Sequence, residues 1–308
     1  MLSRVAESLF WIGRYVERAD GTARILDVHL QLMFEDPMID ESTACHYLLY
    51  VLGSPEDESI TLTSADVLSK LATDLESTPS IRFSLNSARE NARRAREIIS
   101  TEFWESLNTI TQQMPRKVKA DRMHAFFHWV CERTAMATGI AQTTMSRDEA
   151  YQFYSAGMNL ERADMTARLL ATRAHSPNWT TLLRSCGAYE SCLRTYRGVP
   201  SIRNAAEFLL VDRLFPRSVM YSLNRVLTAL TKLEPLSGMP DRTNRHADPQ
   251  WIVGRAISQL EYLAVDEIID DLAVKMDEIQ VATSRAAEAI SERYFPADAV
   301  PTWVGEQT

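Results

Sequence analysis

The sequence predicts an all-α protein, a multi-helix bundle with an internal duplication. Residues 17–26 read ERADGTARIL and residues 161–170 read ERADMTARLL, which are identical at eight of ten positions. A match of this length inside one chain indicates duplication. Apolar residues recur at three- and four-residue steps, whereas no segment shows the alternation of a strand. The 308 residues include only ten glycines, too few for a turn-dense all-β fold.

The first expected helix is a long amphipathic one over residues 3–35, which Asp36-Pro37 ends. The second copy of the repeat lies on a helix over 147–174, which opens on the capping-box pattern SRDE at 146–149. The other expected helices cover 44–52, 63–74, 80–100, 102–112, 117–137, 179–196, 201–213, 217–234, 250–271 and 272–293. The polar, proline-containing stretch 235–249 predicts a mobile loop.

A second internal likeness extends the duplication. Residues 80–86 read SIRFSLN and residues 218–224 read SVMYSLN, so each ER helix is followed by an SxxxSLN helix at a similar distance along the chain. We therefore expect two similar halves that share one core with approximate two-fold symmetry. The predicted units are a single helical domain over 1–295, its halves over about 1–144 and 145–295, and a tail over 296–308.

Composition narrows the classes of function. The formal net charge of −8 argues against an attraction to nucleic acid or to anionic membranes. No apolar run approaches the roughly 20 residues that span a bilayer. The four cysteines form no CxxC pair, which favours reduced thiols and a cytoplasmic protein. The chain has no glycine-rich phosphate loop and no GxSxG motif, and no nucleophile triad can be argued from spacing.

Each copy of the repeat places charged residues on one helix face and apolar residues on another. Two carboxylates at i and i+3 precede an arginine four residues later, and a glycine lies one turn before the first carboxylate. That glycine, Gly13 or Gly157, would let another backbone or a ligand approach closely. The candidate ligand-binding residues on these faces are Glu17, Arg18, Asp20, Arg24, Glu161, Arg162, Asp164 and Arg168.

Three interpretations of these faces stay open. The pairs could be structural, within one helix or between the two copies. The arginines could instead bind carboxylate or phosphate groups of a ligand. Four carboxylates on facing helices could also hold a divalent metal such as Mg²⁺, but this ranks last because the arginines compete for the same oxygens. No cofactor is otherwise predicted.

Two further clusters have structural and functional interpretations. Arg89 and Arg93 belong to a stripe on the 80–100 helix, which predicts a solvated surface, or else a face toward the ER carboxylates or an acidic partner or peptide. His124, His128 and Cys131 also share a helix face and are candidate zinc ligands. The aromatic residues around them favour a packing helix instead.

Three segments together resemble the Alpha-E family, bacterial all-helical proteins named for a Glu-Arg motif. They are residues 1–27, which end in VERADGTARILD, residues 87–108 with SARENAR and FWESLN, and residues 144–170 from TMSRDEAY to ERADMTARLL. The likeness spans nearly the whole chain, although Met158 stands where the first copy has Arg14. The resemblance gives motif roles to Glu17, Arg18, Glu161 and Arg162, and further to Arg89, Glu90, Asn91 and Arg93.

The resemblance also implies partners: a circularly permuted ATP-grasp ligase and a transglutaminase-like peptidase, in ATP-dependent peptide or amide-bond synthesis. The leading hypothesis is therefore an accessory or binding component of such a ligase system that acts through its paired Glu-Arg faces. The alternative is a transferase or amide-forming enzyme that uses Glu17 or Glu161 as a general base in a shared polar pocket. A third hypothesis is a purely structural scaffold.

Overall fold

The computed structural model describes residues 1–35, 40–171, 179–237, 247–262 and 264–296. These ranges contain fourteen α-helices and no β-strand, which confirms the all-α prediction. The helices are α1 (Ser3–Glu35), α2 (Glu41–Val51), α3 (Ser64–Leu68), α4 (Ile81–Arg94), α5 (Thr101–Gln113), α6 (Met123–Thr144), α7 (Glu149–Ala171), α8 (Trp179–Ser185), α9 (Tyr189–Tyr196), α10 (Ile202–Val211), α11 (Val219–Ser237), α12 (Pro249–Tyr262), α13 (Val265–Asp270) and α14 (Leu272–Tyr294).

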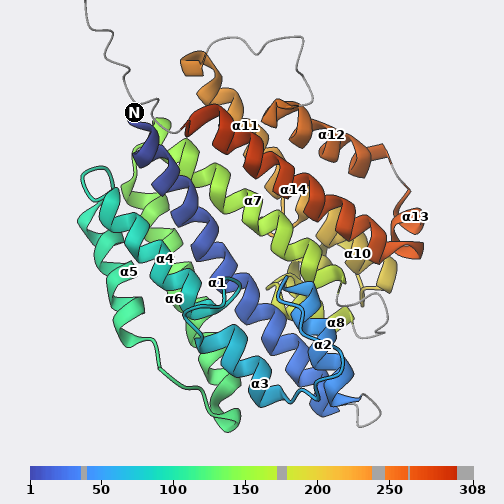
Figure 1. The fold of residues 1–308 in the computed structure, drawn as a ribbon. Helices are drawn as coiled ribbons and strands as arrows, with labels where there is room; N and C mark the ends of the chain where they lie inside the picture. Colours follow the sequence, from blue (N-terminus) through green and yellow to red (C-terminus); the bar gives the residue numbers. More distant parts are fainter. Residues whose placement is uncertain (36–39, 172–178, 238–246, 263, 297–308) are drawn as a thin grey trace, which may run out of the picture.

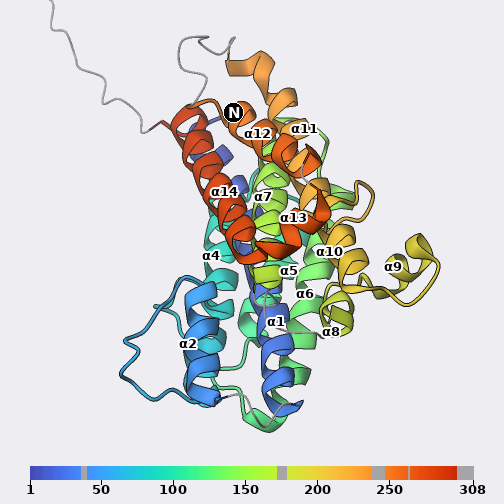
Figure 2. The same cartoon turned by 90° about the vertical axis from the view of Figure 1, so that its right-hand side faces the viewer.

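The two ER helices, α1 and α7, lie side by side at the centre of the bundle and run in the same direction (Figure 1). Helices α4 and α6 pack against α1, and helices α11 and α14 pack against α7. Helix α5 packs on α4 and α6, and α12 packs on α11 and α14. Figure 2 shows α14 and α12 on one side of α7, with α4, α5 and α6 behind. Each ER helix therefore has an equivalent set of neighbours.

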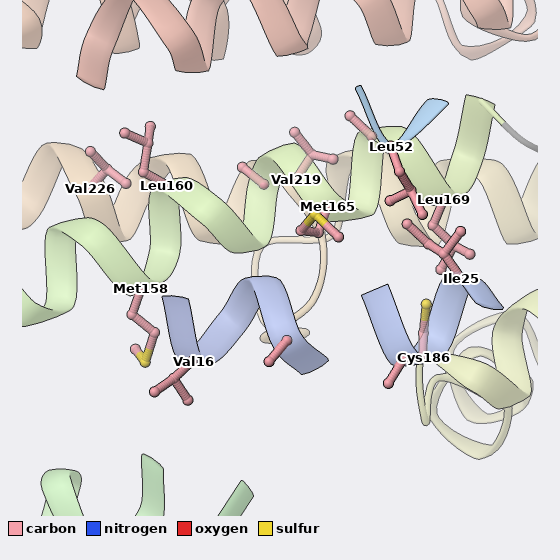
Figure 3. Packing of buried hydrophobic residues seen from close by; sticks show 14 of the residues in the cluster. Val16, Ile25, Leu52, Met158, Leu160, Met165, Leu169, Cys186, Val219 and Val226 are labelled. Atoms are coloured by element: carbon pink, nitrogen blue, oxygen red, sulfur yellow. The ribbon is translucent and has the colours of Figure 1, made fainter. Parts of the chain in front are cut away.

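The core is continuous across the two central helices. Figure 3 shows Met158 of α7 pointing toward Val16 of α1, with Ile25 and Leu169 further along the same pair. Helix α7 is buried along almost its whole length, and only Arg168 between Ala150 and Ala171 is partly exposed. Its polar side chains must therefore find partners inside the protein, because an unpaired buried charge is very costly.

The two SxxxSLN helices begin with the same local contacts. Ser80 caps α4 by accepting a hydrogen bond from the backbone N–H of Phe83, and the Ser80 hydroxyl donates to the carbonyl of Asp74. Ser218 makes the matching contacts at the start of α11, with the N–H of Tyr221 at 3.0 Å and the carbonyl of Asp212. The first serine of SxxxSLN thus fixes where each helix begins.

The structure differs from the sequence prediction at several helix ends. The helix expected over 179–196 is two helices, because Gly187 adopts a φ of +62° between α8 and α9. The helix expected over 80–100 ends at Arg94, and α3 passes into a π-helical turn over Ser69–Thr73. Most of the predicted loop over 235–249 lies outside the described residues, as does the tail after residue 296. Across the described ranges, none of the helices combines the length and apolarity needed to cross a membrane.

Candidate functional site

The backbones of α1 and α7 touch where Gly13 and Gly157 face each other. A Cβ added at Gly157 would lie 2.0 Å from the carbonyl oxygen of Phe10. A Cβ added at Gly13 would lie 2.4 Å from the carbonyl oxygen of Tyr154. Because the obstructing atoms are backbone, only glycine allows this approach.

Gly21 and Met165, one of the two mismatched pairs between the repeats, face each other two turns beyond this glycine contact. A Cβ added at Gly21 would lie 2.7 Å from the Cβ of Met165, which is its counterpart in the other copy. The missing side chain on α1 thus makes room for the methionine on α7. The two copies depart from identity here because they occupy one shared space.

The ER motifs bind each other across the helix pair. Arg162 donates to both carboxylate oxygens of Glu17, with Nε at 3.0 Å from Oε2. Arg18 donates to both oxygens of Glu161, at 2.5 Å from Nε to Oε1 and 3.2 Å from Nη2 to Oε2. Glu17 is 3% exposed and Glu161 is 1% exposed. The glutamate of each motif is therefore held by the arginine of the other motif in a buried, bidentate pair.

Each motif glutamate has a second arginine, but the two second arginines come from non-equivalent positions. Arg14 of α1 donates to Glu161 at 2.6 Å. Arg217, just before α11, lies 3.7 Å from Glu17 and 2.9 Å from the carboxylate of Asp20. Met158 takes the place of Arg14 in the second copy, and Pro79 precedes Ser80 as Arg217 precedes Ser218. Each motif glutamate therefore has two arginines beside it, although the second arginine comes from a different position in each half.

The motif aspartates lie at the next turn and also form symmetric contacts. Asp20 accepts from Arg24 at 2.7 Å and from the hydroxyl of Thr134 on α6 at 3.1 Å. Asp164 accepts from Arg168 at 2.7 Å and from the hydroxyl of Thr283 on α14 at 3.0 Å. These contacts connect each ER helix to the equivalent neighbour.

The two outer arginines reach across to short helices of the opposite half. Arg24 of α1 donates to the carbonyl of Ser185 at the end of α8. Arg168 of α7 donates to the carbonyl of Val51 at the end of α2. Each guanidinium binds a carbonyl in the last turn of a short helix, where the helix itself supplies no N–H donor. The halves are therefore linked in both directions.

Electrostatics keep Glu161, Asp20 and Arg162 ionised. Burial raises the pKa of Glu161, but the charges of Arg14 and Arg18 and their hydrogen bonds outweigh it and lower that pKa to about 2. Burial opposes ionisation of Asp20 as well, yet Arg217 and Arg24 hold the pKa of its carboxyl far below the ordinary range. Burial lowers the pKa of Arg162, and Glu17 more than compensates, so that this pKa is raised.

Two pseudo-equivalent cavities flank the helix pair, and they differ in size. The larger one, about 230 Å³, is lined by Arg14, Arg18, Glu161, Asp164 and Arg168 together with residues such as Pro79. We call it the open cavity. Its counterpart, of about 10 Å³, is lined by Glu17, Arg24, Arg162 and Arg217 among others. We call it the closed cavity, since the Arg217 side chain lies where the open one has only proline.

The pocket shared by Glu17 and Glu161, on which the enzyme hypothesis depended, is not found among the described residues. Glu161 lines the open cavity and Glu17 lines the closed one. The reason is that the reciprocal arginine pairs place the two glutamates on opposite sides of the helix pair. Of the predicted residues, Arg18, Glu161, Asp164 and Arg168 line the open cavity, whereas Glu17, Arg24 and Arg162 line the closed one, with Asp20 hydrogen-bonded beside it.

The predicted Arg89 and Arg93 do not join either cavity. Arg89 donates to the side-chain oxygen of Asn108 at 2.7 Å and lies over the ring of Trp104 on α5. Arg93 is 62% exposed and pairs with Glu90 at 3.0 Å. The hypothesis that this stripe faces the ER carboxylates is therefore wrong, because α4 presents it toward α5 and the solvent.

The residues proposed as metal ligands do not form a cluster in the described part of the chain. No group of three or more His, Cys, Asp or Glu side chains is placed there to hold an ion. His124 binds Asp27 at 2.7 Å, and His128 lies 3.6 Å from Glu132, both on exposed side chains. Burial, followed by the nearby Asp20, raises the pKa of the Cys131 thiol to about 12.

Several residues of the network were missed by sequence reasoning. Arg217 lies directly before the second SxxxSLN segment, so an alignment of the halves extended by one residue would have paired it with Pro79. Thr134 and Thr283 lie on helices α6 and α14, which show no detectable repeat. No sequence signal marks them, because a threonine that binds a buried carboxylate looks like any other helical threonine.

Comparison with known proteins identifies the chain's family. Residues 1–295 match the Alpha-E family, described as a predicted alpha-helical domain with a conserved ER motif. The chain belongs to the Alpha-E family. Uncharacterised proteins of Mycobacterium bovis and Mycobacterium tuberculosis are 24% identical over 347 aligned residues, which cover 99% of this chain. The chain spans only 38% of the length of these relatives. No solved structure matches the chain significantly.

Proposed function

We propose that this Alpha-E protein is a non-catalytic binding component of an ATP-dependent peptide- or amide-ligase system. In this proposal the Glu-Arg faces do not contact the partner directly. They join the two halves and shape the open cavity, which binds a ligand. The observation that carries the proposal is the difference between two equivalent cavities, of which one is filled by Arg217 and the other is left open.

The state of the glutamates favours binding over catalysis. A general base needs a carboxylate that is free to accept a proton and has a pKa near the working pH. Both oxygens of Glu161 are bound by arginines, and its pKa is lowered to about 2. Both oxygens of Glu17 are bound by Arg162. Glu161 is therefore a weak base, and both carboxylates hold arginines in place.

The partner in this proposal is a circularly permuted ATP-grasp ligase, with a transglutaminase-like protein in the same system. The argument for these partners is the family resemblance. In the mycobacterial relatives the matched region is 38% of a longer chain, which supports a role beside further protein sequence. A cytoplasmic location, without nucleic acid or membrane as a partner, belongs to the same proposal.

The test measures ATP-dependent amide formation by the purified ligase with and without this chain. We expect no turnover by the chain alone, and a change in ligase activity or co-elution with the ligase when the two are mixed. Turnover by the chain alone would support the enzyme alternative instead. Absence of any effect on the ligase and of any association would refute the proposal.

The cavity is tested by a variant that copies the other half of the protein. Pro79→Arg places an arginine where the closed cavity has Arg217 and should fill the open one. Pro79→Ala is the matched control, since it removes the proline without filling the space. We expect Pro79→Arg alone to abolish the effect on the ligase at an unchanged circular-dichroism spectrum. Equal activity of both variants would show that the open cavity has no part in it.

A further inference from the structure

We infer that the open cavity binds a small zwitterion, an α-amino acid whose carboxylate is bound by Arg14 and Arg18 and whose ammonium group is bound by Asp164. This inference rests on the part of the proposed function that makes the open cavity a ligand site. It is argued from what this cavity has and lacks in comparison with the closed one.

The anion-binding half of the cavity is a buried arginine with unused donors. Arg14 is 9% exposed and uses Nε to bind Glu161. Within the described ranges, its two terminal amino groups have no acceptor, and Arg18 likewise leaves Nη1 without one. The Arg14 guanidinium lies 5.2 Å from the ring centre of Trp11, which restricts its orientation. Two positioned guanidinium groups with spare N–H donors are suited to a carboxylate.

The cation-binding half is an aspartate that lacks a partner its counterpart has. Asp20 accepts from Arg24 and Thr134 and is also bound by Arg217 at 2.9 Å. Asp164 has the equivalents of the first two contacts, and in the described part of the chain no third group takes the place of Arg217. The protein thus supplies a cation beside one aspartate. Beside the other, Pro79 leaves room for a cation from outside.

The charge of the lining selects a ligand that carries both signs. Three guanidinium groups and two carboxylates line the open cavity, which leaves one positive charge in excess. A simple amine would be repelled by that excess, whereas a simple anion would leave the place beside Asp164 empty. A zwitterion satisfies both sides, because its ammonium and carboxylate groups are separated by a single carbon atom.

Size agrees with a small amino acid. The open cavity has a volume of about 230 Å³, which is below the usual range of roughly 300–1,000 Å³ for drug-sized ligands. Thr78 and Ser284 add hydroxyl groups at its wall, and Leu52 and Met165 add apolar surface for a side chain. A free amino acid therefore fits better than a folded partner or a nucleotide.

The experiment is isothermal titration calorimetry on the full chain without any ligase. The twenty standard L-amino acids are titrated first, followed by the amide and the N-acetyl derivative of the tightest binder. We expect at least one amino acid to bind. Both derivatives should bind at least about tenfold more weakly, because each lacks one charged contact. Sodium acetate, sodium phosphate and methylamine are titrated as probes that carry charge of only one sign.

Two variants taken from the other half of the chain locate the site. Arg14→Met introduces the residue of the second copy, and Pro79→Arg introduces that of the closed cavity; each should weaken binding by about tenfold or more. Arg93→Ala is the control, since Arg93 is exposed and lies outside the cavity, and it should bind as the wild type does. Circular dichroism checks that each variant is folded. If Arg14→Met does not fold, Pro79→Arg still tests the site.

Three results would overturn the inference. They are no binding by any amino acid, equal binding by the charged and derivatised forms, and unchanged binding in both cavity variants. Acetate or phosphate binding as tightly as the amino acid would identify a simple anion site instead. If the ligase associates with the chain but no amino acid binds, this inference fails while the proposed function stands. If an amino acid binds but the chain neither affects nor associates with the ligase, the proposed function fails while this inference stands.

Discussion

The contact between the two central helices predicts the effect of one added methyl group. In Gly157→Ala, the new Cβ would lie 2.0 Å from the carbonyl oxygen of Phe10 and 2.8 Å from its carbonyl carbon. Ordinary contact begins near 3.4 Å, so the helices must separate by more than an ångström. Neither obstructing atom can rotate away, because both belong to the backbone of α1.

The cost follows from the usual energetics of overpacking. Inserting a methyl group into a tightly packed core costs about 1–3 kcal/mol, and occasionally more. Alanine recovers about 1 kcal/mol of helix propensity relative to glycine. These two effects leave a loss of up to about 2 kcal/mol. Separation of α1 from α7 also lengthens the buried pairs of Glu17 with Arg162 and of Arg18 with Glu161, which we expect to add roughly 1 kcal/mol, for a net loss of about 3 kcal/mol.

The measurement is urea unfolding followed by far-UV circular dichroism. Gly139→Ala on α6 and Gly254→Ala on α12 are matched controls, because a Cβ at either position meets nothing within 4 Å. Both controls should keep or raise the unfolding midpoint. If Gly157→Ala is as stable as these controls, the helices are not in backbone contact at this position.

The remaining predictions concern the charges and the mismatched pair. Glu161→Gln leaves Arg14 and Arg18 without their buried counterion and should reduce the unfolding free energy by about 3–5 kcal/mol at neutral pH, whereas an unchanged free energy would mean that the pair is solvated. The lowered pKa of Glu161 means that its stabilisation is complete above its ordinary pKa near 4.5 and is lost as the pH falls toward 2. The difference between wild type and Glu161→Gln should therefore shrink by roughly 3 kcal/mol over that interval in urea titrations, and a constant difference would contradict the assignment. Gly21→Met alone should lower the melting temperature because it meets Met165, and adding Met165→Gly should restore most of the loss; a double variant no better than Gly21→Met would show that the two positions do not share one space.

The buried ion pairs affect how a binding experiment with glutamate variants is interpreted. Loss of ligase association after replacing Glu17 and Glu161 with alanine would not by itself identify a binding surface, because both residues are buried ion-pair partners. The cavity variants avoid this problem, since Pro79→Arg leaves all four motif charges in place.

The sequence alone determined the fold class and the polar face of each ER helix. Helical periodicity showed which face of each repeat is apolar, and buried residues such as Val16, Ala19 and Leu160 follow it. The duplication indicated two matched polar faces, and Gly13 and Gly157 indicated a close approach. These features are local, because they depend on the spacing of residues along one helix.

Tertiary structure alone decided which charges meet and where space remains. Glu17 could have paired within its own helix, with Arg14 one turn earlier, or with any of several arginines on other helices. The parallel packing of α1 on α7 directs it to Arg162. Arg217 and Pro79 occupy equivalent places, yet their effect on cavity volume depends on how α11 and α4 dock. Such contacts join residues more than a hundred positions apart, and the energy of a buried charge depends on every group around it. Helical spacing therefore predicts the faces, and only packing determines their partners.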